Sequence, residues 1–150
     1  MTKTLTMSFL DNKSLSLKEY SLFINHYNEN NWIKIQTNSI TAFPRMLVKF
    51  VHNNNKNTFF MFLKNVIIVS KENEIIVKSL SDIHFYKQSK EKQNYKQYIN
   101  EIKDQMFKLK AMQYVGLSVD ETILLEDLHN ELYELELKQL LNIKERDAYE

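Results

Sequence analysis

Apolar and polar residues alternate along much of the first half of the chain with the two-residue period of β-strands. Leu5, Met7 and Phe9 alternate with threonine and serine, so we expect an N-terminal strand with one buried face. Later runs rich in β-branched and aromatic residues predict further short strands. These runs cover residues 32–37, 46–51, 58–63, 66–70, 74–80 and 83–86. The polar connections between them are short, which favours antiparallel hairpins.

Two of these runs, FFMFL and VIIV, are apolar at every position. Strands of this kind are usually covered on both faces, so we expect them at the centre of the sheet. Pro44 precedes another run and is expected to open that strand, where a missing amide donor is tolerated.

One segment near the N-terminus has a helical spacing instead. Ser16 and Glu19 stand three residues apart, as in a helix capping box. The apolar residues that follow are spaced by three and four positions. They are Leu17, Tyr20, Phe23, Ile24 and Tyr27. The pattern predicts a helix over residues 16–28 that covers one face of the sheet.

From about Gln88 the apolar spacing becomes that of a long helix. Its stripe consists of Tyr95, Tyr98, Ile99, Ile102, Met106 and Leu109. Gly116, the only glycine, stands where a left-handed residue would end this helix. Ser118 and Glu121 form a second capping box, and a leucine stripe follows at 124, 125, 128, 132 and 135. We therefore expect two long antiparallel helices, the second running from Val119 to about Asp147.

These elements predict an α+β protein. Its parts are an N-terminal strand and helix, an antiparallel sheet of five to six strands or a small barrel, and a long C-terminal helical hairpin. We expect an α+β sheet domain over residues 1–88. The hairpin over residues 89–150 is expected to pack on that domain and to extend past it.

The second predicted helix has a second apolar sector, rotated away from the leucine stripe. Its members are Tyr133, Leu137, Leu140 and Leu141. One sector packs on the first helix, so the other needs the sheet domain or another chain. An intramolecular core and a protein interface, with a homodimer favoured, are both open.

Charged residues line the edges of the two predicted helices. Lys92, Lys96, Lys103 and Lys110 follow one edge of the first stripe, and Asp120, Asp127, Glu131 and Glu134 follow one edge of the second. In an antiparallel pair these two edges do not face each other. They are therefore candidates for contact with a partner, although a charged helix edge in solvent is an equally good interpretation.

Composition excludes several kinds of chemistry. The chain has no cysteine, so it has no disulfide, thiol nucleophile or thiolate metal site. One glycine cannot build a phosphate-binding loop, and the four histidines lack metal-ligand spacing. We therefore expect no catalytic residue, no metal and no cofactor. A hydrolase stays a third interpretation, because aspartate, glutamate, histidine and serine residues that are distant in sequence can converge in one pocket. Neither a leader nor a membrane span is visible, which favours a cytoplasmic protein.

A basic, aromatic part of the sheet supports an alternative function. Arg45, Lys49, Lys56 and Lys64 are interleaved with phenylalanines, and residues 1–88 carry 11 basic against 6 acidic side chains. Such a surface can stack single-stranded bases. Phenylalanines in central strands are more often core, however, and lysines at strand ends protect sheet edges.

The sequence therefore favours a non-enzymatic binding or regulatory protein. It would self-associate through the hairpin and act on a protein partner; a nucleic-acid-binding module is the alternative. The abundance of asparagine, lysine and isoleucine is typical of an AT-rich genome, such as that of a low-GC bacterium, its phage or another mobile element. Together with the absence of catalytic motifs and the extra apolar helical surface, this agrees with an accessory or inhibitor protein of a phage or mobile element.

Overall fold

The computed structural model describes residues 3–146 of the chain and confirms the α+β class. By its internal contacts the chain divides into two units. The sheet unit comprises Met1–Ser89 with Ile143–Glu150, and the helical unit comprises Lys90–Asn142. Each unit is described by itself below.

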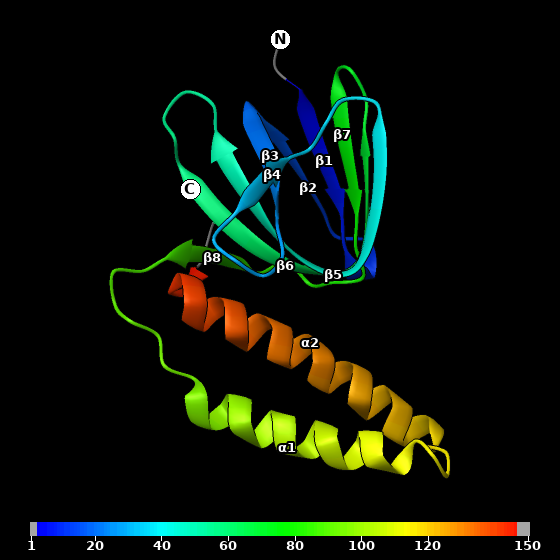
Figure 1. Ribbon diagram of the computed structural model, residues 1–150. Helices are drawn as coiled ribbons and strands as arrows, with labels where there is room; N and C mark the ends of the chain where they lie inside the picture. The colour runs from blue at the N-terminus through cyan, green and yellow to red at the C-terminus, as the bar shows by residue number, and fades with distance from the viewer. Residues whose placement is uncertain (1–2, 147–150) are drawn as a thin grey trace. The chain divides into compact units, whose positions relative to one another are not determined.

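The sheet unit is built on one nine-stranded sheet, with a short 3-10 helix at Leu10–Asn12 (Figure 1). The strands are β1 (Thr4–Ser8), β2 (Ser14–Lys18), β3 (Tyr20–Asn25), β4 (Trp32–Lys34), β5 (Ser39–His52), β6 (Thr58–Ser70), β7 (Glu74–Lys78), β8 (Phe85–Gln88) and β9 (Ile143–Arg146). Seven of them follow the order β2-β1-β7-β6-β5-β3-β4, while β8 pairs with β6 and with β9. The pair β1–β7 is parallel and the other pairs are antiparallel, so the sheet is mixed where a fully antiparallel one was predicted.

Strands β5 and β6 form the long central hairpin of this sheet, as the apolar runs in β6 predicted. Runs 58–63 and 66–70 are one strand that bends at Asn65, whose φ is 47°. The ladder pairs Phe43 with Val66 and Arg45 with Lys64, and it skips Pro44. Pro44 therefore lies inside β5 instead of opening a strand, at a point where the ladder is already interrupted and no amide donor is needed.

At this bend the strand that pairs with β6 on the side away from β5 changes from β7 to β8. Two buried serines lie between the two pairings. β6 pairs with β7 from Ile67 onward and with β8 at Phe60. Between them, the backbone N–H of Lys64 donates to Ser81 Oγ at 2.7 Å, and Ser79 Oγ donates to the Lys64 carbonyl at 2.8 Å. Ser81 thus satisfies the Lys64 N–H at a point where β6 has no strand partner on this side, and the Lys64 carbonyl also accepts from Leu80 N at 3.0 Å.

The core shows that the sheet curls on itself. One apolar cluster joins Leu5 and Leu17 from one end of the strand order with Leu22 and Phe50 from the other. These side chains can share a cluster only if the two ends of the sheet face each other, as the curved strands in Figure 1 show. Opposing parts of the sheet therefore supply the cover that sequence analysis assigned to an N-terminal helix.

The predicted helix over residues 16–28 is wrong. β2 ends at Lys18, β3 begins at Tyr20, and Glu19 between them has a φ of 65°. Within each strand the side chains that face the core are two residues apart. Glu19, between the strands, shifts this alternation by one position. Leu17, Tyr20 and Ile24 consequently fall three and four positions apart, which imitates a helix.

The helical unit confirms the predicted hairpin of α1 (Lys96–Met112) and α2 (Val119–Leu141). The leucine stripe of α2 packs with α1 in one cluster that contains Ile102, Met106, Leu109, Leu125 and Leu128. The predicted capping box is present: Ser118 N donates to Glu121 Oε1 at 3.0 Å, and Glu121 N donates to Ser118 Oγ at 3.1 Å.

The apolar stripe of α2 ends in two polar residues. Their side chains accept hydrogen bonds from backbone N–H groups in the segment that leads into α1. Gln139 Oε1 accepts from Tyr95 N at 2.7 Å, and Asn142 Oδ1 accepts from Gln93 N at 3.2 Å. Asn142 is also left-handed, with a φ of 55°, and it ends α2. The helix therefore stops at Leu141 instead of continuing to Asp147, which lies outside the described residues.

Gly116 has a φ of 98°, so its backbone is left-handed as predicted. It stands after the turn that follows α1, not directly at the helix end, because α1 stops at Met112. An added Cβ would meet no heavy atom within 4 Å, so the cost of a substitution comes from the positive φ of the backbone.

We expect Gly116→Val to lower the free energy of unfolding by more than about 1 kcal/mol, since a β-branched residue is strained at positive φ. Gly116→Asn should cost less, because asparagine tolerates this region better. Urea denaturation of the three proteins checks this. Equal stability of the valine variant and the wild type would contradict the assigned turn.

Candidate functional site

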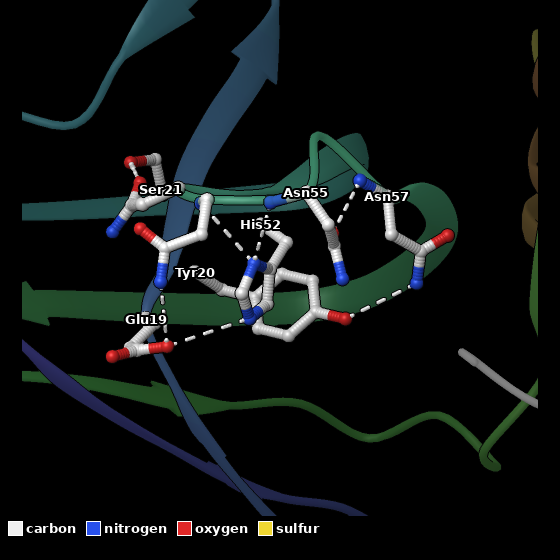
Figure 2. Close-up of polar contacts among 8 residues, drawn as sticks. Glu19, Tyr20, Ser21, His52, Asn55 and Asn57 are labelled. Atoms are coloured by element: carbon white, nitrogen blue, oxygen red, sulfur yellow. Dashed lines mark hydrogen bonds and ion pairs between the residues drawn. The ribbon is translucent and has the colours of Figure 1, made fainter.

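A polar cluster surrounds His52 at the turn between β5 and β6 (Figure 2). His52 Nδ1 accepts the backbone N–H groups of Asn54 and Asn55, each at 3.2 Å. Its Nε2 lies 3.6 Å from Glu19 Oε2, which also accepts from Asn54 Nδ2 at 3.1 Å. Since Nδ1 is an acceptor, the neutral ring carries its proton on Nε2, toward the carboxylate.

Tyr20 packs edge-on against this histidine, with the ring centroids 5.0 Å apart. Its hydroxyl accepts a hydrogen bond from Asn57 Nδ2 at 3.3 Å. Beside it lies an open depression of about 590 Å³ whose lining includes Ser16, Lys18 and Asn55. The cluster thus combines the rings of Tyr20 and His52 with the side-chain amides of the turn.

The cluster does not form a nucleophile and base pair. Ser21 Oγ donates to Asn53 Oδ1 at 2.6 Å, whereas both ring nitrogens of His52 have other contacts. A general base must reach the hydroxyl that it activates. Among residues 3–146, no group of three histidine, cysteine or acidic side chains could hold a metal ion.

Lys49 lies over two aromatic rings on the sheet. Its Nζ is 4.7 Å from the centroid of Trp32 and 5.1 Å from that of Phe23. Partial burial lowers the pKa of the Lys49 amine below its ordinary value. The cation is thus partly desolvated and held by cation–π contacts, not free in solvent.

The other predicted nucleic-acid residues do not form a base-stacking surface. Arg45 is half-buried in β5, Lys56 is exposed in the turn, and Lys64 is exposed at the bend of β6. The phenylalanines interleaved with them are all buried. They are Phe50, Phe59, Phe60 and Phe62. The core interpretation therefore accounts for these rings.

The second apolar sector of α2 is partly exposed. Leu137 and Leu141 are buried and Tyr133 is half-buried, whereas Leu140 is 55% exposed. Val119 and Ile123 fall in the same sector, within about 100° on a helical projection. Sequence analysis missed these two, although their helical spacing from Leu137 could have revealed them.

The two charged rows of the hairpin lie at its surface. Each lysine of the basic row is exposed, and so are Asp120, Asp127 and Glu131. Glu134 is half-buried, with Oε2 4.0 Å from Lys138 Nζ. Within the described part of the chain no ion pair joins one row to the other.

Both parts of the chain match known proteins. A family profile described as "UU051 N-terminal domain" matches residues 4–84, and one described as "Uncharacterised protein UU051 C-terminal domain" matches residues 96–146. The "Uncharacterized protein UU051" of Ureaplasma parvum serovar 3 is 32% identical over 146 residues, covering 93% of this chain and 85% of the relative. Neither the family descriptions nor the name of the relative states an activity. Over residues 3–146, no helix is long and apolar enough to cross a membrane.

Replacing Lys49 by methionine should change the fluorescence of Trp32, the only tryptophan, while the free energy of unfolding stays within about 1 kcal/mol. Methionine keeps the packing over the rings and removes a partly desolvated charge. Because the folded-state pKa is lowered, any cost of the charge is present at neutral pH and fades as the pH rises toward the ordinary lysine pKa.

Lys18→Met, at an exposed position in β2, is the matched control and should leave the emission unchanged. Identical emission from Lys49→Met and the wild type would contradict the contact.

Proposed function

We propose that this chain, which belongs to the UU051 family, is a non-enzymatic cytoplasmic binding protein that acts through a protein partner. A second copy of the chain is the favoured partner. The contact is made by an apolar surface at the turn of the helical hairpin, which we call the tip surface and define as Tyr114, Val115, Val119 and Ile123.

One observation carries this proposal. The four side chains of the tip surface are 98%, 88%, 76% and 55% exposed, although they lie within ten residues of one another. Large apolar side chains gathered on an exposed surface are typical of protein interfaces, whereas single exposed ones are ordinary.

Charge at the tip supports a contact between identical chains. Lys110 ends the basic row beside the turn, and Asp120 and Asp127 begin the acidic row on the other helix. In a twofold dimer, the basic edge of each hairpin can meet the acidic edge of its partner. The same charges make the association weaker at high salt.

Other functions have less support. Nucleic-acid binding through the sheet is disfavoured, because the phenylalanine rings that would stack on bases are buried in the core. The Lys49 cation that would contact phosphate lies over the ring of Trp32. A hydrolase would need a base free to activate a nucleophile, whereas the His52 ring nitrogens have other contacts. The phage or mobile-element origin stays a prediction from composition.

The oligomeric state tests the proposal. Light scattering of the full chain should give a mass that rises with concentration toward twice the 18.0 kDa of one chain. Ile123→Glu places a charge in the tip surface and should weaken association at least about tenfold. The full chain is required, because β9 pairs with β8 and a truncation before the hairpin would remove a strand of the sheet unit.

Tyr98→Glu is the control, since Tyr98 is 62% exposed on α1 but lies far from the turn. It should associate like the wild type. A wild-type mass of one chain at every concentration would refute self-association, and an Ile123→Glu dimer of unchanged affinity would refute the tip surface.

A further inference from the structure

A second depression, of about 330 Å³, lies in the sheet unit where the curled sheet brings separate segments together. Lys3, before β1, and Lys34, in β4, both line it. Its apolar lining includes Leu22, Ile35 and Ile75, whose side chains are buried. The depression therefore combines an apolar floor with two cations.

Hydrogen-bond donors converge on this depression. Lys3 Nζ donates to Thr37 Oγ1 at 2.7 Å and to Ser70 Oγ at 3.2 Å, which places the ammonium group beside two hydroxyls. Asn53 Oδ1 accepts from Ser21 Oγ, so the amide nitrogen of Asn53 is turned away from that bond. Within the described chain, neither the Asn53 amide nitrogen nor Lys34 Nζ has a hydrogen-bond or ion-pair partner.

No carboxylate lines the depression. The nearby carboxylate of Glu19 contacts His52 and Asn54 instead. Two ammonium groups without a counter-charge, together with hydroxyl and amide donors, make a site of positive potential. Its missing component is an anion.

We propose that this depression binds a small phosphate-bearing molecule. Lys3 and Lys34 pair with the phosphate, and Thr37 and Asn53 donate hydrogen bonds to its remaining oxygens. Four donors from separate segments suit the several oxygens of a phosphate better than the two of a carboxylate. The volume exceeds that of phosphate alone, so the apolar floor contacts an apolar or planar body. This site is independent of the tip surface.

Nuclear magnetic resonance of the isotope-labelled full chain tests the site. Inorganic phosphate, titrated at constant ionic strength, should cause saturable shifts of the backbone amides of Ser21, Lys34, Thr37 and Asn53. Phenyl phosphate should bind more tightly, because its ring contacts the floor. Acetate should bind more weakly, because it offers fewer oxygens.

Lys34→Gln should weaken phosphate binding at least about tenfold, the loss expected for one charged hydrogen bond. Lys78→Gln, at an exposed lysine outside the depression, makes the same change in net charge and should leave the affinity unchanged. The amide spectrum reports whether each variant is folded.

Three results would overturn the proposal. They are the absence of saturable shifts, equal binding of acetate and phosphate, and equal weakening by the two lysine variants. The last of these would show a diffuse effect of charge instead of a site.

Discussion

The architecture of the sheet unit depends on the part-buried contact between two serines and the backbone of Lys64. At the bend of β6 the ladder with β5 is interrupted and the neighbour on the other side changes from β7 to β8. Ser79 and Ser81 occupy this gap, are only 5% and 6% exposed, and lie 3.0 Å apart through their hydroxyl oxygens. An unpaired Lys64 N–H beside these buried hydroxyls would be costly, so Ser81 stabilises the bend.

The same junction fixes the N-terminal strand. Ser79 N donates to the Ser8 carbonyl at 3.0 Å, and Leu10 N donates to the Ser81 carbonyl at 3.1 Å. These bonds hold the end of β1 beside β7 and establish the parallel pair. At the other end of β1, the curl of the sheet places Lys3 within hydrogen-bond distance of Thr37, from the segment after β4. The proposed phosphate site thus depends on the curl of the sheet.

Local patterns predicted the elements whose signals are local. The α1–α2 hairpin followed from apolar spacing, one glycine and one capping box, because each of these acts within a few residues. The helix over residues 16–28 failed because the positive φ of Glu19 shifts the phase between two strands. The sequence does not indicate this break between two strands, because glutamate seldom adopts a positive φ.

The polar sites were beyond sequence reasoning for a different reason. Lys3, Lys34 and Asn53 are distant in sequence and come together only through the curl of the sheet. The run HNNNKN indicated a turn, but nothing in it shows that His52 contacts Glu19. The exposure of the tip surface depends on packing, although its apolar residues were visible.

Ser81→Ala tests the central role of the serine junction most directly. The variant leaves the part-buried N–H of Lys64 without its acceptor, so urea denaturation should show a loss of about 1 to 3 kcal/mol. Ser16→Ala, at an exposed serine of β2, should stay within about 0.5 kcal/mol of the wild type. Equal stability of the two variants would contradict the claim that this contact holds the bend.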